Sequence, residues 1–333
     1  MFLIEIEPKS RILIIRFSSI GDIVLATSAL TTVRNAYPTA QITFLTLDNF
    51  APLLEFHPYI DRLIPLSKKM SVLNLWKFSE YIRKQKFSII FDLHNSIRSN
   101  IIASRAGCTV HQLRKPRWNR FLLFLFHQNE FDENFSTRKM YHNHLGEIWQ
   151  DGDEIPNTSL IVTEHEKSEA VKLVGQNPFI SIVPGAAWLQ KQWTAKKYVE
   201  LIQNLKIPVV LLGAKKDIIC FQIKDKAPYV INLAGKTSLR QALAVLSNSS
   251  HVIGSDTGLT HAAEALGISV SMILGPTSTE TGAGTHLPIS TNIQKSIWCR
   301  PCSQNGKRPC YRKTQICMDS VSTSDVIQTL PFG

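Results

Sequence analysis

The feature that most constrains the fold of this chain is the regular alternation of apolar, β-branched segments with segments of helical periodicity, in two successive blocks. Such alternation predicts parallel sheets with helices on both faces. In the first block we predict strands over residues 11–16, 41–45 and 88–93, a helix over 22–37 and another after Asn95. In the second block the predicted strands are 179–183, 209–212, 230–233, 251–253 and 270–274, with helices near 195–205, 216–226, 238–247 and 259–266.

Two doubly wound α/β domains are therefore expected, and 333 residues are enough to build both. The composition turns polar and carries Pro and Gly over residues 150–157, so the junction is predicted there or in the charged helix just after it. We expect an N-terminal Rossmann-like domain at residues 1–160 and a C-terminal one at residues 161–333.

Composition and charge indicate the class of protein and of partner. With 44% hydrophobic and 19% charged residues the chain is globular, and its net charge of +11 favours an anionic partner. Nucleic acid, an acidic membrane surface and a phosphorylated small molecule all fit that charge. Residues 1–7 are too acidic for a signal peptide, and the apolar run 121–126 is too short to span a bilayer. We expect a cytoplasmic protein.

The stretch HVIGSDTGLTHAAEALG, residues 251–267, predicts a buried strand, a polar turn and a helix. Such a turn lies at the carboxyl end of a parallel strand, where open α/β sheets bind ligands. Gly258 lets a phosphate approach the backbone at the helix start, and Asp256 suits sugar hydroxyls better than a phosphate that it would repel. The alternative is that Asp256 and Thr257 only cap the helix.

The stretch RFSSIGDIVLA, residues 16–26, has the same strand–turn–helix pattern. Ser18, Ser19 and Gly21 make the turn, and Asp22 follows in the first helical turn. An acid at that position stabilises the helix dipole, and it is equally placed to serve as a general base.

A third turn is VPGAAWLQKQW, residues 183–193, in which small residues again follow a strand. They let a ligand approach the backbone, and Lys191 is suited to neutralise a diphosphate as a mobile point charge. The alternative is a solvated loop lysine.

The C-terminal segment gathers four of the six cysteines: Cys299, Cys302, Cys310 and Cys317. The first pair has the spacing of a metal knuckle, whereas the second pair is spaced too widely for one. A cytoplasmic location disfavours structural disulfides, so a structural metal and reduced thiols both stay open.

Three other patterns bear on the class of protein. The basic residues of 114–120 followed by the apolar run 121–126 fit a membrane-surface segment or a buried helix with a basic end. No Gly-x-Gly-x-x-Gly follows the first strand of either block, which disfavours a dinucleotide oxidoreductase. The absence of Gly-x4-Gly-Lys-Ser/Thr likewise disfavours a P-loop NTPase.

Five stretches in order, RFSSIGDIVLATSAL, KQW, LLGAKKD, LAGKTSLRQALAVL and VIGSDTGLTHAAEALG, resemble the heptosyltransferase family, glycosyltransferase family 9. The resemblance runs from about Arg11 to Asp325 and includes the cysteine-bearing tail. It implies a GT-B fold, two Rossmann-like doubly wound domains facing an interdomain cleft, with a last helix able to return to the N-terminal domain. It also implies inverting transfer of heptose from ADP-heptose to the lipopolysaccharide inner core, on a Kdo-lipid A or heptosylated core acceptor.

The resemblance also implies residue roles. Asp22 matches the general base, and Lys191 matches the lysine that steadies the donor diphosphate. The donor would be bound by Gly185, Asp217, Asp256, Thr257, Gly258 and His261, and the acceptor by Ser18, Ser19, Gly21 and Arg98. Ala186 and Ala187 stand where some members carry threonines, so backbone donors must serve there. No cofactor is required by this mechanism.

The implied partners are ADP-heptose, the anionic lipid A and core acceptor, and the cytoplasmic face of the inner membrane, where the protein would be peripheral. Basic residues of the N-terminal block are expected to contact that membrane: Lys68, Lys69, Arg98, Arg114, Lys115, Arg117 and Arg120. Two alternatives remain. A sugar-nucleotide epimerase shares the GT-B architecture and would turn over a UDP-sugar without an acceptor. A nucleic-acid-binding protein would show steeply salt-dependent binding, but no nucleic-acid module is recognisable and we expect no such partner.

Overall fold

The computed structural model describes residues 10–331. Residues 1–7, on which the expectation of no signal peptide rests, lie outside that range. The chain forms two compact units. Residues up to Lys115 together with Arg138–Ile161 make unit 1, and Pro116–Thr137 together with the residues from Val162 onward make unit 2. The domain bounds 1–160 and 161–333 stay a prediction. The two units differ from them mainly because Pro116–Thr137 belongs to unit 2.

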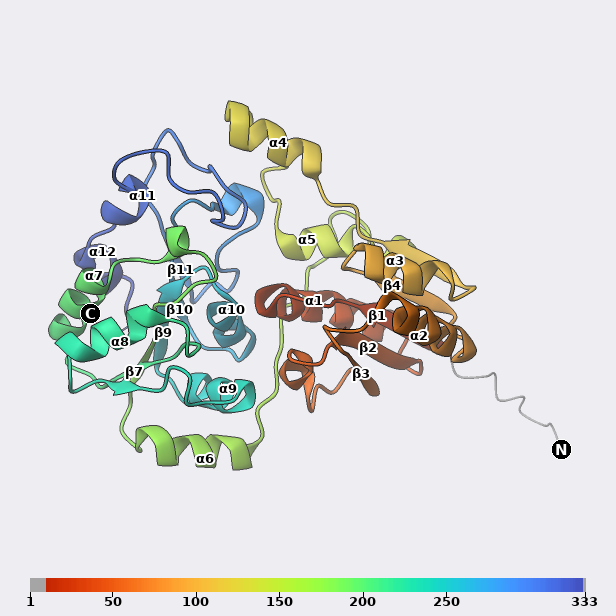
Figure 1. Ribbon diagram of the computed structural model, residues 1–333, viewed down its shortest axis with the longest axis horizontal. Coiled ribbons are helices and arrows are strands. Elements are labelled where there is room, and N and C mark those ends of the chain that lie inside the picture. Colours follow the sequence, from red (N-terminus) through yellow and green to blue (C-terminus); the bar gives the residue numbers. More distant parts are fainter. Residues whose placement is uncertain (1–9, 332–333) are drawn as a thin grey trace. The chain divides into compact units, whose positions relative to one another are not determined.

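Unit 1 contains a parallel five-stranded sheet in the order β3-β2-β1-β4-β5 (Figure 1). Its strands are β1 (Arg11–Ile15), β2 (Gln41–Leu47), β3 (Arg62–Leu66), β4 (Ile89–Asp92) and β5 (Thr109–Gln112). Its longer helices are α1 (Ile20–Ala36), α2 (Val72–Lys84) and α3 (Ile97–Ser104). The sequence therefore predicted β1, β2 and β4 correctly, together with the helix that follows each of β1 and β4.

The core of unit 1 follows from the alternation of side chains along β1. Leu13 and Ile15 share an apolar cluster with Leu75 of α2 and Ile102 of α3. The intervening Ile12 and Ile14 are equally buried and point to the opposite face of the sheet. A strand that is apolar on both faces is typical of a parallel sheet covered on both sides.

Unit 2 contains a parallel six-stranded sheet in the order β11-β10-β9-β6-β7-β8. Its strands are β6 (Ile180–Val183), β7 (Val209–Leu211), β8 (Ile231–Asn232), β9 (His251–Ser255), β10 (Val270–Ile273) and β11 (Thr291–Ile293). The helices between them are α7 (Ala195–Asn204), α8 (Ile218–Lys226), α9 (Leu239–Ser247) and α10 (Gly258–Ala265). All five strands and all four helices that the sequence predicted in this block are confirmed.

The remaining helices are short or lie outside the two alternating series. They are α4 (Arg117–Phe126), α5 (Thr137–His142), α6 (Glu164–Val174), α11 (Ile316–Asp319) and α12 (Thr323–Ile327), with 3-10 turns at Ala51–Leu54, Gly146–Ile148, Leu189–Lys191 and Thr279–Thr281. The family resemblance allowed the last helix to return to the N-terminal domain, but α12 lies in unit 2. Its Val326 packs in the apolar cluster that contains Tyr198 and Leu201 of α7.

Strands β3, β5 and β11 were not predicted, and all three are edge strands. Edge strands carry polar residues or proline, as in the sequence TVHQ of Thr109–Gln112 and at Pro65 of β3, so their apolar pattern is weak. Helix α4 resolves the ambiguity of residues 117–126, because only Leu123 of that helix is buried. The buried-helix interpretation is therefore wrong.

Within residues 10–331, no helix is long and apolar enough to cross a bilayer.

The packing of unit 1 gives a matched test of its core. Leu13 is fully buried in β1, whereas Leu73 on α2 is 65% exposed. We expect Leu13→Ala to lower the free energy of unfolding of unit 1 by about 2–5 kcal/mol, since a cavity adds to the lost apolar burial. Leu73→Ala should change it by less than about 0.5 kcal/mol. Urea unfolding followed by circular dichroism measures both, and equal effects would contradict this description of the core.

Candidate functional site

The turn at residues 256–257 is placed as the sequence predicted, between the end of β9 and the start of α10, with Thr257 as the helix N-cap. Strand β9 lies between β6 and β10 in the middle of the unit 2 sheet. The loops that follow β6 and β10 at the same edge carry Lys191 and Thr277, and both side chains reach the turn. This is the carboxyl edge of a parallel sheet, the usual ligand position in open α/β folds.

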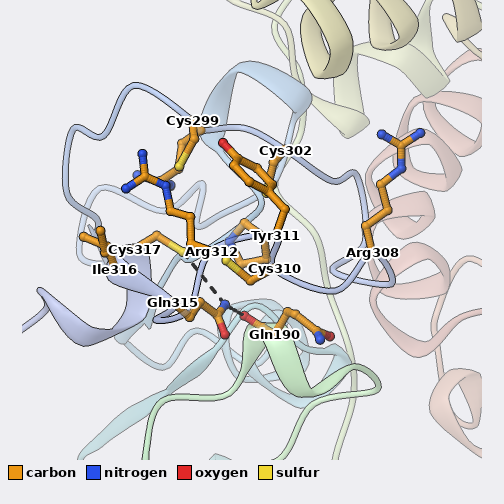
Figure 2. A pocket seen from close by; sticks show the side chains of 12 residues that line it. Gln190, Cys299, Cys302, Arg308, Cys310, Tyr311, Arg312, Gln315, Ile316 and Cys317 are labelled. Carbon is orange, nitrogen blue, oxygen red and sulfur yellow. Dashed lines mark hydrogen bonds between the residues drawn. The ribbon is translucent and has the colours of Figure 1, made fainter.

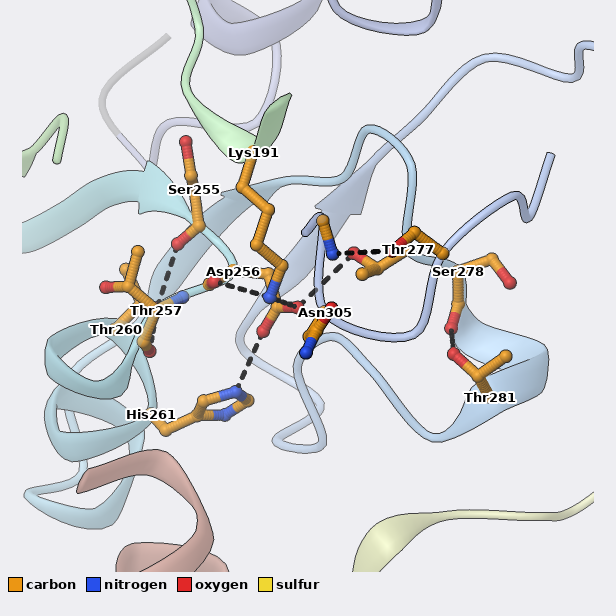
Figure 3. A network of polar contacts seen from close by, with 12 residues as sticks. Lys191, Ser255, Asp256, Thr257, Thr260, His261, Thr277, Ser278, Thr281 and Asn305 are labelled. Carbon is orange, nitrogen blue, oxygen red and sulfur yellow. Dashed lines mark hydrogen bonds and ion pairs between the residues drawn. The ribbon is translucent and has the colours of Figure 1, made fainter. Parts of the chain in front are cut away.

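Asp256 is the centre of a polar network in this turn (Figure 3). One of its carboxylate oxygens accepts from Lys191 Nζ at 2.5 Å and from Thr277 Oγ1 at 3.3 Å, and the other lies 3.1 Å from His261 Nε2. Lys191 Nζ also donates to the Asp256 carbonyl at 3.0 Å. The Lys191 and Asp256 side chains are only 14% and 10% exposed, so the ion pair is screened little by solvent.

The charges of the network are set by these contacts. Burial opposes ionisation of Asp256, but Lys191 and His261 outweigh it and hold the pKa of the carboxyl far below its usual range. Burial also opposes protonation of His261, but Asp256 outweighs it and raises the pKa of the imidazole. The network is therefore a buried carboxylate between the Lys191 ammonium and an imidazole whose protonation Asp256 favours, with Lys191 held at the start of α10.

Several buried polar atoms in and near this network have no hydrogen-bond partner among the described residues. Among them are Thr257 Oγ1 and His261 Nδ1 at the turn itself, and Ser278 Oγ in the loop after β10. Buried polar atoms in folded proteins are rarely left unsatisfied, so the two at the β9–α10 turn indicate a place for a polar ligand. Because Asp256 is bonded through both oxygens, these atoms are better placed than its carboxylate to receive ligand groups. The donor roles of Asp256, Thr257 and His261 stay predictions, and the contact that the structure shows for Asp256 is its ion pair with Lys191.

Gly185 and Asp217 lie together at the next part of the same edge. A Cβ at Gly185 would lie 2.6 Å from Asp217 Cγ, so only glycine allows this approach of the β6 turn to the start of α8. Asp217 Oδ2 accepts from the Ala214 backbone N–H at 2.7 Å. The aspartate therefore closes its own loop, and its donor role stays a prediction.

The predicted base of unit 1 is held by four donors. Asp22 Oδ2 accepts from the Ser19 N–H at 3.1 Å and from Ser19 Oγ at 2.8 Å. Arg16 Nη2 lies 2.8 Å from Asp22 Oδ1, and the Tyr141 hydroxyl donates to the same oxygen at 3.2 Å. Burial opposes ionisation, but Arg16 and Ser19 outweigh it and lower the pKa of Asp22. The carboxylate is ionised at neutral pH, and its side chain is 37% exposed.

Arg16 and Tyr141 are site residues that sequence reasoning missed. Arg16 opens the quoted motif RFSSIGDIVLA directly after the apolar residues 12–15, and this position was the available signal. The structure buries it, which is unusual for an arginine. Tyr141 is 119 residues from Asp22 in the sequence, and no local pattern could have connected them.

Arg98 is placed at the start of α3, where its guanidinium donates to the Ser67 carbonyl at 2.9 Å and to the Lys68 carbonyl at 3.3 Å. These bonds fix the loop before α2. Arg98 is not in the Asp22 network, and its acceptor role stays a prediction, as do those of Ser18 and Gly21.

The four cysteines of the tail line one small cavity, together with Gln190, Arg308 and Arg312 (Figure 2). All of them are free thiols. Burial and the neighbouring cysteines raise the pKa of Cys302 to about 11, so this thiol stays protonated at neutral pH. No three Cys, His, Asp or Glu side chains of residues 10–331 converge as a metal-ligand set. A metal at these cysteines stays a prediction.

The comparisons with known proteins agree with this architecture. The family model described as Glycosyltransferase family 9 (heptosyltransferase) matches residues 75–315. Lipopolysaccharide heptosyltransferase 2 of Escherichia coli (strain K12) is 26% identical over 294 residues, which cover 80% of this chain and 83% of that protein. Lipopolysaccharide heptosyltransferase 1 of Pseudomonas aeruginosa is 21% identical over 331 residues, covering 89% and 90%.

Among solved structures, the E. coli ADP-heptose lps heptosyltransferase II superposes with a TM-score of 0.75 at 24% identity, over 96% of this chain and 97% of that one. Two parallel sheets of this kind define a GT-B fold, as predicted. The chain belongs to glycosyltransferase family 9, the heptosyltransferase family, and is a transferase enzyme. The resemblance seen in the sequence motifs is confirmed.

Two histidines of unit 2 should titrate in different pH ranges. Asp256 raises the pKa of His261, whereas burial lowers the pKa of His251 to about 4. His251 is held by Ser269 and Ser271 hydroxyls, each at 2.7 Å. Nitrogen-15 NMR over a series of pH values should therefore show that His261 loses its proton at a higher pH than a free imidazole does, and His251 at a lower one.

The same pair predicts opposite pH dependences of stability. The contribution of His261 to the free energy of unfolding is complete below the unfolded-state pKa of about 6.5. It is lost as the pH rises through the raised pKa of this histidine in the folded protein. The His251 contribution is complete above about 6.5 and is lost as the pH falls toward its folded value of about 4. Comparing the parent with His261→Gln and with His251→Gln isolates the contribution of each histidine to the pH dependence of stability. If both imidazoles titrated near the ordinary value of about pH 6.5, the described contacts of the two histidines would be contradicted.

Proposed function

We propose that this protein transfers heptose from ADP-heptose to an acceptor of the lipopolysaccharide inner core, with inversion at the anomeric carbon. The relatives named above support the donor and the acceptor class. The observation that carries the proposal is the buried Lys191–Asp256–His261 network at the β9–α10 turn. It holds a cation beside a helix N-terminus at the ligand-binding edge of the sheet.

On the donor side, the first turn of α10 offers free backbone N–H groups and the positive end of the helix dipole to the diphosphate. Lys191 supplies a positive charge, and its attraction for the departing ADP strengthens as negative charge develops on that leaving group. Asp256 keeps that ammonium in place, which is a positioning role. Thr257 Oγ1 and His261 Nδ1 remain available for phosphate or sugar oxygens.

On the acceptor side, Asp22 is the proposed general base. The acceptor oxygen forms a bond to the anomeric carbon as the bond from that carbon to the ADP oxygen breaks, and Asp22 takes the hydroxyl proton. One base and a single displacement give inversion, with no covalent intermediate. The lowered pKa keeps Asp22 in its basic form at neutral pH, and its exposed fraction leaves it reachable by a hydroxyl.

The proposal assigns the acceptor to an N-terminal domain of residues 1–160 and the donor to a C-terminal domain of residues 161–333. It requires no cofactor. We further propose that the protein works as a peripheral protein at the cytoplasmic face of the inner membrane. Its basic residues, among them Lys68, Lys69 and Arg98, would meet the phosphates of lipid A.

The test is calorimetric titration with ADP, UDP and ADP-heptose, combined with transfer assays on parent, Lys191→Ala and Asp22→Asn. We expect the parent to select ADP over UDP. Lys191→Ala should weaken ADP binding at least tenfold, because it removes the cation and leaves Asp256 under-paired. Asp22→Asn should bind ADP-heptose as the parent does, while the rate of transfer falls by about 10²–10⁴-fold.

A matched control is Lys206→Ala, which removes an exposed lysine of unit 2 outside the network and should leave ADP binding unchanged. Selection of UDP with turnover in the absence of an acceptor would contradict the proposal and favour an epimerase. Full transfer by Asp22→Asn would contradict the assignment of the base.

A further inference from the structure

We propose that helix α4 and the cysteine-bearing tail of unit 2 form a docking surface for an anionic lipid bilayer. The surface, termed here the aromatic patch, consists of six exposed side chains: Trp118, Phe121, Leu125, Phe126, Trp298 and Tyr311. This inference rests on the proposed function, whose acceptor is a membrane lipid, and deepens it by naming the part of the protein that meets the membrane.

The helix presents its apolar side chains outward. Trp118, Phe121 and Leu125 recur at intervals of three and four, so they share one face of α4, and they are 67%, 43% and 49% exposed. Trp118 and Phe121 stack with ring centroids 5.3 Å apart, and Phe121 meets Phe126 edge-on at 5.9 Å. Only Leu123 of this helix is buried. Large apolar side chains gathered in this way mark an interaction surface.

The tail extends the same surface. Trp298 and Tyr311 are 68% and 67% exposed, with ring centroids 6.5 Å apart. Two contacts join the tail to α4 and its end: His127 meets the Trp298 ring at 6.3 Å, and Arg120 donates to the Gln304 amide oxygen at 3.0 and 3.1 Å once that amide is oriented to accept. All of these residues belong to unit 2. Tyr311 and Arg312 stand beside the cysteine cavity in Figure 2.

The charge of the patch identifies its partner. No Asp or Glu occurs in residues 114–129 or 281–318, whereas Arg117, Lys307, Arg308 and Lys313 are exposed there. The Arg312 guanidinium lies 4.7 Å from the centroid of the Trp298 ring. Tryptophan, phenylalanine and leucine on one face with arginine and lysine around them is the composition of helices that lie in the interface of anionic membranes.

Two other occupants fit less well. In a two-fold contact with a second copy, the patch would meet itself, and its positive charges would face one another without an acid to compensate them. Nucleic acid would account for the charge and the aromatic rings, but not for the exposed aliphatic side chain of Leu125 on α4.

The test is flotation of the full chain with vesicles of phosphatidylethanolamine and phosphatidylglycerol, and with vesicles of phosphatidylcholine alone. The parent should bind the anionic vesicles and lose that binding at high salt. The variant W118S/L125S/W298S should bind at least tenfold more weakly, since three apolar anchors are lost. In R117S/K313S the affinity should fall about fivefold for each basic residue removed.

Matched control variants change exposed residues elsewhere on unit 2. Ile218, Phe221 and Tyr229 are 63%, 42% and 66% exposed, and I218S/F221S/Y229S should bind vesicles as the parent does. The corresponding charge control is K206S/K226S. Vesicle binding by the patch variants equal to the parent's, or an equal loss in the controls, would overturn the proposal.

Further outcomes separate this proposal from its rivals and from the proposed function. A parent that sediments as a dimer, with patch variants that are monomers and no vesicle binding, would overturn the proposal in favour of a second copy. Tighter binding to single-stranded RNA than to vesicles would overturn it in favour of nucleic acid. On a deacylated, water-soluble acceptor the patch variants should transfer as the parent does, whereas Asp22→Asn should fail there yet still bind vesicles. Vesicle binding that depends on the patch, in a protein without transfer activity, would support the docking surface and contradict the function alone.

Discussion

The polar network at the carboxyl edge of the unit 2 sheet depends on one buried ion pair, between Lys191 and Asp256. A carboxylate removed from water is costly unless charge and hydrogen bonds compensate for it, and here Lys191, His261 and Thr277 together do so.

Residues of the C-terminal tail also support this ion pair. A Cβ at Gly306 would lie 2.7 Å from Lys191 Cγ, so the tail backbone packs directly on the lysine stem. Arg300 donates to the Thr277 carbonyl at 2.8 Å and supports the loop that contacts Asp256. The cysteine-bearing segment is thus part of the support of the site.

The two units share one structural feature, which differs in its exposure to solvent. In each, an aspartate at a turn between strand and helix is paired with a basic residue: Asp22 with Arg16, and Asp256 with Lys191. The difference lies in exposure, since the Asp22 side chain is 37% exposed and that of Asp256 only 10%. An accessible carboxylate can take a proton from a substrate. A buried one is out of a substrate's reach, and the carboxylate of Asp256 holds the Lys191 cation beside it.

Much of this could be predicted from the sequence, because parallel strands buried on both faces read as apolar runs. Every central strand was found in this way, as was the position of each turn that carries Asp22, Lys191 or Asp256. The edge strands β3, β5 and β11 were missed, since exposure removes that pattern. Partners distant in the chain were also missed. Lys191 and Asp256 were given separate tasks, and nothing local connects them across 65 residues or connects Tyr141 to Asp22 across 119. The family motifs added the chemistry that periodicity alone left open.

The most direct test of the account is a single-turnover reaction with saturating ADP-heptose and a core acceptor, with the anomeric configuration of the product read by NMR for the parent and Asp22→Asn. The account predicts one product of inverted configuration from the parent, and a transfer step slowed by about 10²–10⁴-fold in Asp22→Asn with donor binding retained. Retention of configuration, or an unchanged rate in Asp22→Asn, would contradict it.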